Sequence, residues 1–178
     1  MEELYLELPI KKRENDAMDY IIEFYTNGSV INGSGSLDSY INLYDKWLQK
    51  LDDDINNVKE GRVPANTYFG VRKSDNKIVG MVNIRHELND YLIESGGGHI
   101  GYAVRPTERG KGYATKILEL ALERCKELGI EEVYLGCYEY NVGSYKTIEK
   151  NGGKLVKNII DEDNVPCRYY VINNAISR

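Results

Sequence analysis

The stretch His99–Ala114, HIGYAVRPTERGKGYA, decides the fold of this chain. It begins as an apolar strand, is interrupted by Pro106, and continues through a glycine-containing turn into a strongly periodic helix. The first amides of a helix lack intrahelical partners, and the helix dipole adds partial positive charge at the same end. The turn also supplies two glycines, which allow close approach to the backbone, and two cationic side chains: Gly110, Gly112, Arg109 and Lys111. The stretch therefore predicts a site for an anion, and phosphate in particular.

The spacing of this turn excludes two common phosphate loops. A P-loop requires Gly, four residues and then Gly-Lys-Ser/Thr, and the chain contains no such run. A dinucleotide fingerprint requires glycine or alanine at the position of Thr115, with its first glycine directly after the strand. The pattern that fits is Arg-x-x-Gly-x-Ala, from Arg109 to Ala114, behind a strand that ends at Val104. At these residues the chain resembles the GNAT superfamily of acyl-CoA-dependent N-acetyltransferases, in which this loop holds the pyrophosphate of coenzyme A.

The resemblance implies acetyl-CoA as the acyl donor and assigns its contacts. In the family, the strand before the loop splays from its neighbour, and its free backbone groups bind the pantetheine arm and the thioester carbonyl. A second family pattern, Asn-x-x-Ala/Ser-x-x-x-Tyr-Glu-Lys-x-Gly, begins at Asn141, which is equally suited to cap a helix. The residues expected to bind the cofactor are Ala103, Val104, Arg109, Gly110, Lys111, Gly112, Tyr113, Ala114, Asn141 and Ser144.

The chain departs from the second pattern at the tyrosine that serves the family as proton donor to the departing thiolate. Ile148 stands there and cannot donate a proton. Tyr145, three residues earlier on a neighbouring part of the same helix surface, is the candidate substitute. With 15 tyrosines in the chain, a packing role for Tyr145 is an equal alternative. Coenzyme A can also leave as a thiolate, because a thiol has a pKa of about 8.5.

The candidates for the general base are the only two histidines, His86 and His99. They lie at the ends of adjacent expected strands, so pairing of those strands would bring the two imidazoles together at the base of the intervening loop. An imidazole titrates near neutral pH and can take a proton from an ammonium group. Histidines at strand ends are more often structural hydrogen-bonding groups. Three glutamates are rival bases or cation-binding groups: Glu87, Glu94 and Glu139.

Composition bounds the class of protein. The chain has 178 residues, 42% hydrophobic and 29% charged, which is typical of one globular domain over residues 1–178. A net charge of −5 argues against a nucleic-acid surface and is compatible with a cationic amine substrate. No apolar run is long enough for a membrane span and no leader is recognisable, so we expect a cytoplasmic protein. Three widely spaced cysteines indicate reduced thiols rather than disulfides or a metal site.

The order of expected elements also follows the GNAT pattern. Strands are expected over residues 4–8, 68–72, 77–85, 100–104, 132–138, 154–160 and 168–172, and helices over 15–25, 37–55, 114–128 and 141–151, with Ser36 as a candidate N-cap. Residues 32–36 are expected to be a flexible connector, and residues 87–98 a long loop that acts as a substrate lid. The resemblance implies an α/β fold: a central mixed, mostly antiparallel sheet with a splayed mid-sheet strand and flanking helices.

These observations predict an N-acetyltransferase that moves the acetyl group of acetyl-CoA directly to a primary amine, either a small molecule or a peptide, while both are bound. The expected partner is the amine, with no nucleic acid or membrane, and a homodimer is left open. The alternative is a non-catalytic acyl-CoA-binding sensor, which Ile148 and the absence of an unambiguous base keep open. A different donor such as succinyl-CoA would need a cation near the acyl end, for which Arg85 is the candidate.

Overall fold

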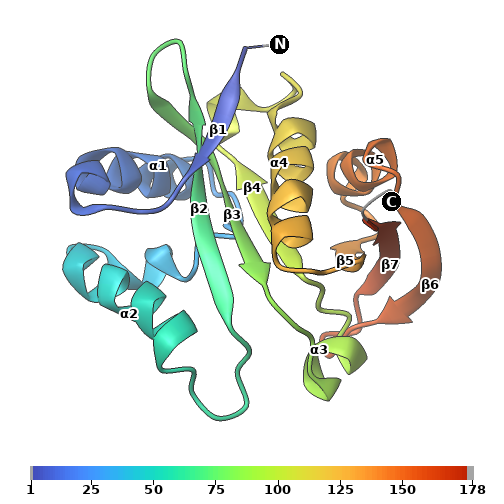
Figure 1. Cartoon of the computed structure of the whole chain (residues 1–178). Helices are drawn as coiled ribbons and strands as arrows, with labels where there is room; N and C mark the ends of the chain where they lie inside the picture. The colour runs from blue at the N-terminus through green and yellow to red at the C-terminus, as the bar shows by residue number, and fades with distance from the viewer. Residues whose placement is uncertain (1, 176–178) are drawn as a thin grey trace.

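The computed structural model describes residues 2–175, and Figure 1 shows an α/β fold. The strands are β1 (Leu4–Glu7), β2 (Ala65–Arg72), β3 (Lys77–Arg85), β4 (Ile100–Val104), β5 (Glu132–Tyr138), β6 (Lys154–Ile160) and β7 (Pro166–Asn173). The helices are α1 (Glu14–Thr26), α2 (Tyr44–Asn56), α3 (Asp90–Glu94), α4 (Tyr113–Glu127) and α5 (Val142–Lys150), with short 3-10 turns at Lys11–Arg13, Leu37–Tyr40 and Pro106–Glu108. The predicted order of strands and longer helices is confirmed, but the expected loop over residues 87–98 contains the short helix α3.

The strands form two antiparallel sheets that meet at β4 and β5. One sheet has the order β1-β2-β3-β4 and the other β5-β7-β6. Where they meet, the His99 amide donates to the Tyr134 carbonyl oxygen at 2.7 Å. Beyond this contact the two strands separate, so β4 loses its partner on the β5 side. This is the splayed mid-sheet strand that the sequence predicted.

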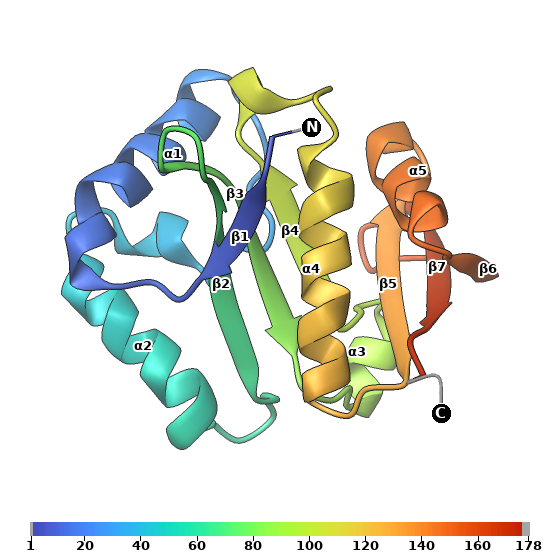
Figure 2. The ribbon, with the colours of Figure 1, turned by 45° about the horizontal axis from the view of Figure 1, so that its top comes forward.

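Helices cover both faces of the larger sheet. Helices α1 and α2 lie on one face, and α4 lies on the other, between β4 and β5 (Figures 1 and 2). Each face has its own hydrophobic core: one under α1 and α2, and one that joins α4 to both sheets. Helix α4 buries the apolar side of its periodic pattern in the second core, with Ile117, Leu118, Ala121, Leu122 and Cys125 all at most 9% exposed.

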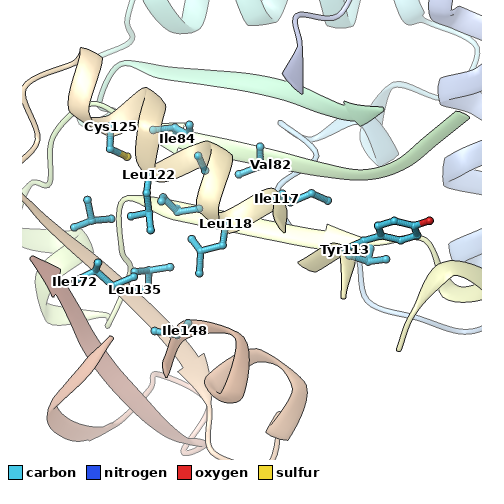
Figure 3. Close-up of a cluster of buried hydrophobic side chains, with 14 of the residues drawn as sticks. Val82, Ile84, Tyr113, Ile117, Leu118, Leu122, Cys125, Leu135, Ile148 and Ile172 are labelled. Carbon is cyan, nitrogen blue, oxygen red and sulfur yellow. The ribbon is translucent and has the colours of Figure 1, made fainter. Parts of the chain in front are cut away.

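Ile148 belongs to the core that holds the two sheets together. Its side chain is 1% exposed and lies in the cluster with Leu118, Leu135 and Ile172 (Figure 3). A tyrosine hydroxyl at this position would need a hydrogen-bonding partner inside an apolar cluster. Ile148 therefore has a packing role, and a buried apolar side chain occupies the position of the family's proton donor.

The helix expected over residues 37–55 is divided in the structure, and this part of the prediction is wrong. Leu37–Tyr40 forms a 3-10 turn, Asn42 has a left-handed φ of 61°, and α2 begins only at Tyr44. Ser36 has a φ of 66° and makes no capping hydrogen bond. The reason is Trp47, which is fully buried and donates its indole N–H to the Gly35 carbonyl oxygen at 2.9 Å. Within α2 the predicted stripe does face the core, where Tyr44, Leu48 and Leu51 pack beside this ring.

The connector over residues 32–36 is packed against the sheet and does not have the character of a free linker. Gly33 has a φ of 68°, and a Cβ atom there would lie 2.7 Å from Tyr102 Cα and collide with the Gly101 carbonyl oxygen. Ser34 is 5% exposed. The segment therefore crosses β4 with its backbone against the strand, which explains why glycine is required there.

Candidate active site

Two cavities lie on either side of β4. The first, which we call the seam cavity, has a volume of about 930 Å³ and lies between β4, β5 and the N-terminal ends of α4 and α5. The second, the α2 cleft, has a volume of about 1050 Å³ and lies between α2, the 31–38 segment, β3 and α3. Four residues line both: Asn32, Arg85, Leu92 and Gly101. The two cavities thus share a boundary, and a ligand in one can reach a ligand in the other.

The seam cavity ends at the predicted phosphate loop. Gly110 and Gly112 have φ values of 75° and 85°, a left-handed conformation that favours glycine. The first intrahelical bond of α4 runs from the Lys116 amide to the Gly112 carbonyl oxygen, at 3.2 Å. The amides of Tyr113, Ala114 and Thr115 therefore have no partner within the helix, and these three residues line the cavity. The loop has the local geometry of an anion site.

The two basic residues of this loop have different environments. Arg109 lines the seam cavity, donates to the Val104 carbonyl oxygen at 3.2 Å and lies over the Phe24 ring. Lys111 was expected to bind the anion with Arg109, but it is not among the described residues that line the cavity. Its ammonium group pairs with Glu108 at 2.8 Å. Arg109 is thus the cation of the loop that faces the ligand.

Glu108 holds the loop together from the protein side. Its carboxylate is 6% exposed and pairs with Arg72 at 2.8 Å and with Lys77 at 3.1 Å, in addition to Lys111. Burial alone would raise the pKa of Glu108, but the hydrogen bonds from these three cations lower it to about 2. Arg72 also pairs with Glu2 and Asp75, so the ion-pair cluster beside the loop is balanced in charge.

All of β4 lines the seam cavity, but only every second residue directs its backbone N–H and C=O groups toward it. The amides of Arg85 and Arg105 donate across to His99 and Val79, which fixes the odd-numbered residues of β4 as the ones hydrogen-bonded to β3. Tyr102 and Val104 therefore direct their backbone groups toward β5 and the cavity. The Ala103 carbonyl oxygen instead accepts from the buried Tyr20 hydroxyl at 3.3 Å. Of the two strand residues expected to bind the cofactor, the alternation favours Val104, with Tyr102 in place of Ala103.

The N-terminal end of α5 forms the opposite wall of the seam cavity. Asn141 caps the helix, because its side-chain oxygen accepts from the Ser144 amide at 3.1 Å. The Ser144 hydroxyl lies 3.1 Å from the Tyr102 hydroxyl. Burial raises the pKa of Tyr102 to about 12, so this phenol stays protonated at neutral pH. Tyr145 packs under the Arg168 guanidinium, 4.3 Å from the ring centre, and is not among the described residues that line the cavity.

His99 is part of the junction between the sheets. Its side chain Nδ1 accepts from the Tyr134 amide at 3.0 Å, and the residue is 7% exposed. Burial, with a further effect of the Arg85 charge, lowers the pKa of His99 to about 4. The lone pair of Nδ1 is therefore occupied by a backbone hydrogen bond, and the imidazole is neutral. His99 does not line either cavity in the described part of the chain.

The other candidate bases also lie outside the two cavities. His86 follows Arg85, the partner of His99, so its side chain leaves the opposite face of the sheet and contacts Asn66 at 2.7 Å. The two imidazoles are therefore not brought together as the sequence suggested. Glu87, Glu94 and Glu139 are exposed and, within residues 2–175, none of them lines the two cavities.

Neither a metal site nor a cysteine nucleophile has support among the described residues. Residues 2–175 contain no group of three or more His, Cys, Asp or Glu side chains placed to hold a metal ion. All three cysteines are free, and burial raises the pKa of the Cys137 thiol, which lines the seam cavity, to about 11. A thiol of this kind is a poor nucleophile at neutral pH. Among the described helices, none is both long and apolar enough to cross a bilayer.

A sheet that opens beside a glycine-rich helix start, with a second cleft at the same opening, defines an α/β protein that holds a phosphorylated ligand next to another molecule. The sequence matches the acetyltransferase (GNAT) family over residues 36–153, well over half of its length. The chain belongs to this family of acyl-CoA-dependent acetyltransferases. No curated protein sequence matches the chain.

Solved structures share the fold at low sequence identity. RimJ from Mycobacterium smegmatis in complex with CoA-disulfide superposes with a TM-score of 0.73 at 13% identity, covering 96% of this chain and 81% of that one. Ribosomal-protein-S5-alanine acetyltransferase from Vibrio fischeri gives 0.73 at 15% identity over 98% and 94% of the two chains. The microcin C7 self-immunity acetyltransferase MccE, in complex with acetyl-CoA and AMP, gives 0.68 at 19% over 96% and 92%.

Of the four residues at the shared boundary, sequence reasoning singled out only Arg85, as a cation near the acyl end of a different donor. Tyr102 was seen only as part of the strand, and Asn32 only as the start of a connector. Leu92 lies in α3, inside the expected loop, where Asn89 caps the short helix by accepting from the Leu92 amide at 3.0 Å. The Asn89 cap is a recognisable local signal, but nothing local indicates that Leu92 reaches both cavities.

Proposed function

We propose that this protein transfers the acetyl group of acetyl-CoA, bound in the seam cavity, directly to a primary amine bound in the α2 cleft. The observation that carries the proposal is the boundary shared by the two cavities at Asn32, Arg85, Leu92 and Gly101. A direct transfer requires the two reactants to be held within contact distance in one complex. A shared boundary next to an open strand edge meets this requirement without a covalent enzyme intermediate.

The residues of the seam cavity fit acyl-CoA. The pyrophosphate would be held by the free amides at the start of α4, by the glycine backbone of the loop and by Arg109. The pantetheine arm would lie along the open edge of β4, opposite Asn141 and Ser144. When bound, acyl-CoA supplies an acetyl group activated as a thioester. The lid role of the 87–98 loop remains a proposal, supported by the position of Leu92 at the boundary.

Two groups of this chain are placed to stabilise charge during transfer. The Val104 amide faces the cavity and can donate to the acyl oxygen as negative charge develops there. The Tyr102 hydroxyl can donate a hydrogen bond to the departing sulfur. Because its pKa of about 12 exceeds that of a thiol, Tyr102 stabilises a thiolate rather than giving up its proton. We therefore assign this role to Tyr102 in place of Tyr145.

The proton of the incoming ammonium has to leave through the α2 cleft. Three carboxylates line the cleft, and two of them are already engaged: Asp54 pairs with Lys50, and Asp53 accepts from Gln49 and Asn57. The Asp38 carboxylate accepts only from the Ser34 hydroxyl, at 3.1 Å, within the described residues. We assign proton uptake to Asp38, directly or through water, in place of His86 and His99.

The test separates binding from transfer. Calorimetric titration with acetyl-CoA measures the cofactor site, and free-thiol release over a panel of amines measures transfer. The boundary can be closed at Gly101, where an added Cβ would be 3.7 Å from the Gly33 amide nitrogen, an ordinary contact. We expect Gly101→Ala to keep both activities, and Gly101→Val to keep acetyl-CoA affinity while losing thiol release.

Each other outcome has a defined meaning. Acetyl-CoA binding without thiol release on any amine would favour a non-catalytic acyl-CoA sensor. That alternative is supported by the position of the two histidines outside both cavities. Absence of acetyl-CoA binding in the wild-type protein would refute both. Unchanged turnover in Gly101→Val would show that the two ligands do not meet at this boundary.

A further inference from the structure

The arginines of the chain divide into two groups. Five of them pair with carboxylates and serve the fold: Arg13, Arg72, Arg105, Arg124 and Arg168. Within residues 2–175, the arginines without a carboxylate partner are Arg62, Arg85 and Arg109, and all three line the two cavities. Arg109 belongs to the phosphate loop. Of the other two, Arg62 is exposed to solvent, whereas Arg85 is partly buried and lacks a counter-ion among the described residues.

Of these two arginines, Arg85 is the stronger candidate for binding an anion. It lines both cavities and is partly buried, and its guanidinium donates to the Gly98 carbonyl oxygen at 2.7 Å. Burial lowers its pKa, and the charge of Arg62 lowers it further, which places the two guanidinium groups within electrostatic reach of each other. A half-buried cation beside a like charge is costly unless a ligand supplies the opposite charge.

The charge balance of the cleft agrees with this reading. The α2 cleft is lined by five basic and three acidic side chains, although the chain as a whole carries a net charge of −5. Lys50 and Asp54 pair at 2.6 Å, so their charges cancel. Arg62 and Arg85 therefore contribute to the positive charge that remains in the cleft. A purely cationic acceptor would meet repulsion at the point where it has to react.

We propose that the acceptor is an amine that also carries a carboxylate close to the reacting nitrogen, as an α-amino acid does, and that Arg85 and Arg62 bind this carboxylate. This inference rests on the proposed function and names its substrate class. The planar fork of arginine matches a carboxylate with two parallel hydrogen bonds. Because Arg85 lies at the shared boundary, a carboxylate bound to it holds a neighbouring amine at the same place. Arg62 lines only the α2 cleft, which puts the carboxylate on the acceptor rather than on the acyl chain.

The experiment compares matched acceptors. L-amino acids and their C-terminal amides are used as pairs, with acetyl-CoA as donor, and kcat/KM is measured for each. Binding of the same pairs to the CoA-saturated protein is measured by calorimetry, so that the comparison does not depend on turnover. We expect the acid of at least one pair to be favoured by roughly 10- to 100-fold over its amide, the range for a charge-assisted hydrogen bond.

Variants connect this preference to the two arginines. Arg85→Gln should lower kcat/KM for the acid to about the level of its amide, and Arg62→Gln should reduce the preference for the acid in part. Arg85→Lys should restore part of it, because the charge is kept while the fork is lost. Arg124→Gln is the matched control: it makes the same substitution on α4, at a residue that lines neither cavity, and should leave the preference intact.

Thermal stability separates a binding role from a structural one. If the role of Arg85 is to bind the acceptor carboxylate, Arg85→Gln should leave the melting temperature of the unliganded protein unchanged or raise it, since an unpaired, partly buried charge is removed. A clear fall in melting temperature, with the acid preference intact, would make Arg85 structural and overturn the proposal. Equal binding and turnover of all acids and amides would also overturn it, while leaving the acetyltransferase function in place.

One further result would place the carboxylate elsewhere. If succinyl-CoA is used better than acetyl-CoA, and Arg85→Gln removes only that preference, the anion belongs to the acyl chain and the proposal fails. Loss of CoA binding in the wild-type protein would instead refute the proposed function itself, so the two failures are distinguishable.

Discussion

A single charge at Gly110 tests where the phosphates of the cofactor lie. Gly110 lines the seam cavity with a φ of 75°, and a Cβ atom built there would have no heavy atom within 4 Å. Asp and Asn both tolerate this left-handed conformation and have nearly the same size. Comparing Gly110→Asp with Gly110→Asn therefore isolates the effect of one negative charge on ligand affinity.

The magnitude follows from Coulomb's law. Two unit charges about 6 Å apart interact by about 3 kcal/mol at an effective dielectric constant of about 20. Counterions weaken this, whereas a pyrophosphate carries more than one charge, so we expect Gly110→Asp to bind coenzyme A about 2 to 3 kcal/mol more weakly than Gly110→Asn. That corresponds to a ratio of dissociation constants of roughly 30 to 150. The folded state has room for either side chain, so the melting temperatures should be similar.

Calorimetric titration with coenzyme A at about 50 mM and about 500 mM salt measures this ratio, which should shrink at the higher salt because of screening. Gly129 provides the control. It follows the other end of α4, has the same φ of 75° and equally open surroundings, and lines neither cavity among the described residues. The Asp and Asn variants at Gly129 should bind coenzyme A alike. Equal affinities of the two Gly110 variants would refute the placement of the pyrophosphate at this loop.

Three further predictions concern stability and the base. Because the pKa of Glu108 is lowered from 4.5 to about 2, its stabilising effect is present above pH 4.5 and is lost as the pH falls toward 2; Glu108→Gln should cost about 1 to 2 kcal/mol at pH 7 and nothing near pH 2, by urea unfolding. Gly33→Ala should cost about 3 kcal/mol through strain and overpacking, against about 1 kcal/mol for Gly61→Ala, which has a φ of 76° and open surroundings. His99→Asn should keep turnover within an order of magnitude, whereas loss of a general base costs about 100- to 10,000-fold. Since the pKa of neutral His99 is lowered from 6.5 to about 4, the wild type should lose more stability than the variant as the pH falls from 6.5 to 4; the loss that remains in the variant includes that from His86, whose pKa burial also lowers.

The parts of the fold that local chemistry determines could be predicted from the sequence. The boundaries of β3, β4, β5 and β6 are those expected, because each strand is an apolar run between turn residues. The phosphate loop was also recognisable, since Gly110 and Gly112 adopt the left-handed conformations that their place before a helix suggests. In both cases neighbours in sequence are neighbours in space.

The division of the 37–55 helix could not be found in this way. Its apolar stripe fits a continuous helix, but Ile41 and Ile55 of that stripe are 42% and 40% exposed. The structure buries Trp47 instead, and its indole bonds to Gly35 in the preceding segment. Within α2 the pattern placed Tyr44, Leu48 and Leu51 on the correct face. The hydrogen bond between the Trp47 ring and the Gly35 carbonyl oxygen leaves no periodic trace in the sequence, so the break before α2 was missed.

The two halves of the candidate site differ in the same way: one consists of neighbours in sequence, and the other of residues brought together by folding. The seam cavity is built on a contiguous motif and on the start of α5, so nine of the ten residues expected to bind the cofactor line it. The α2 cleft brings together Asn32, Arg62 and Arg85, which are separated by whole strands and loops. Within the described residues, neither arginine has a carboxylate partner. The sequence cannot show this, because it depends on where the other charged side chains lie in the folded structure. The cofactor half of the reaction is therefore specified locally, while the choice of acceptor is specified by tertiary packing, which is where proteins of one fold are free to differ.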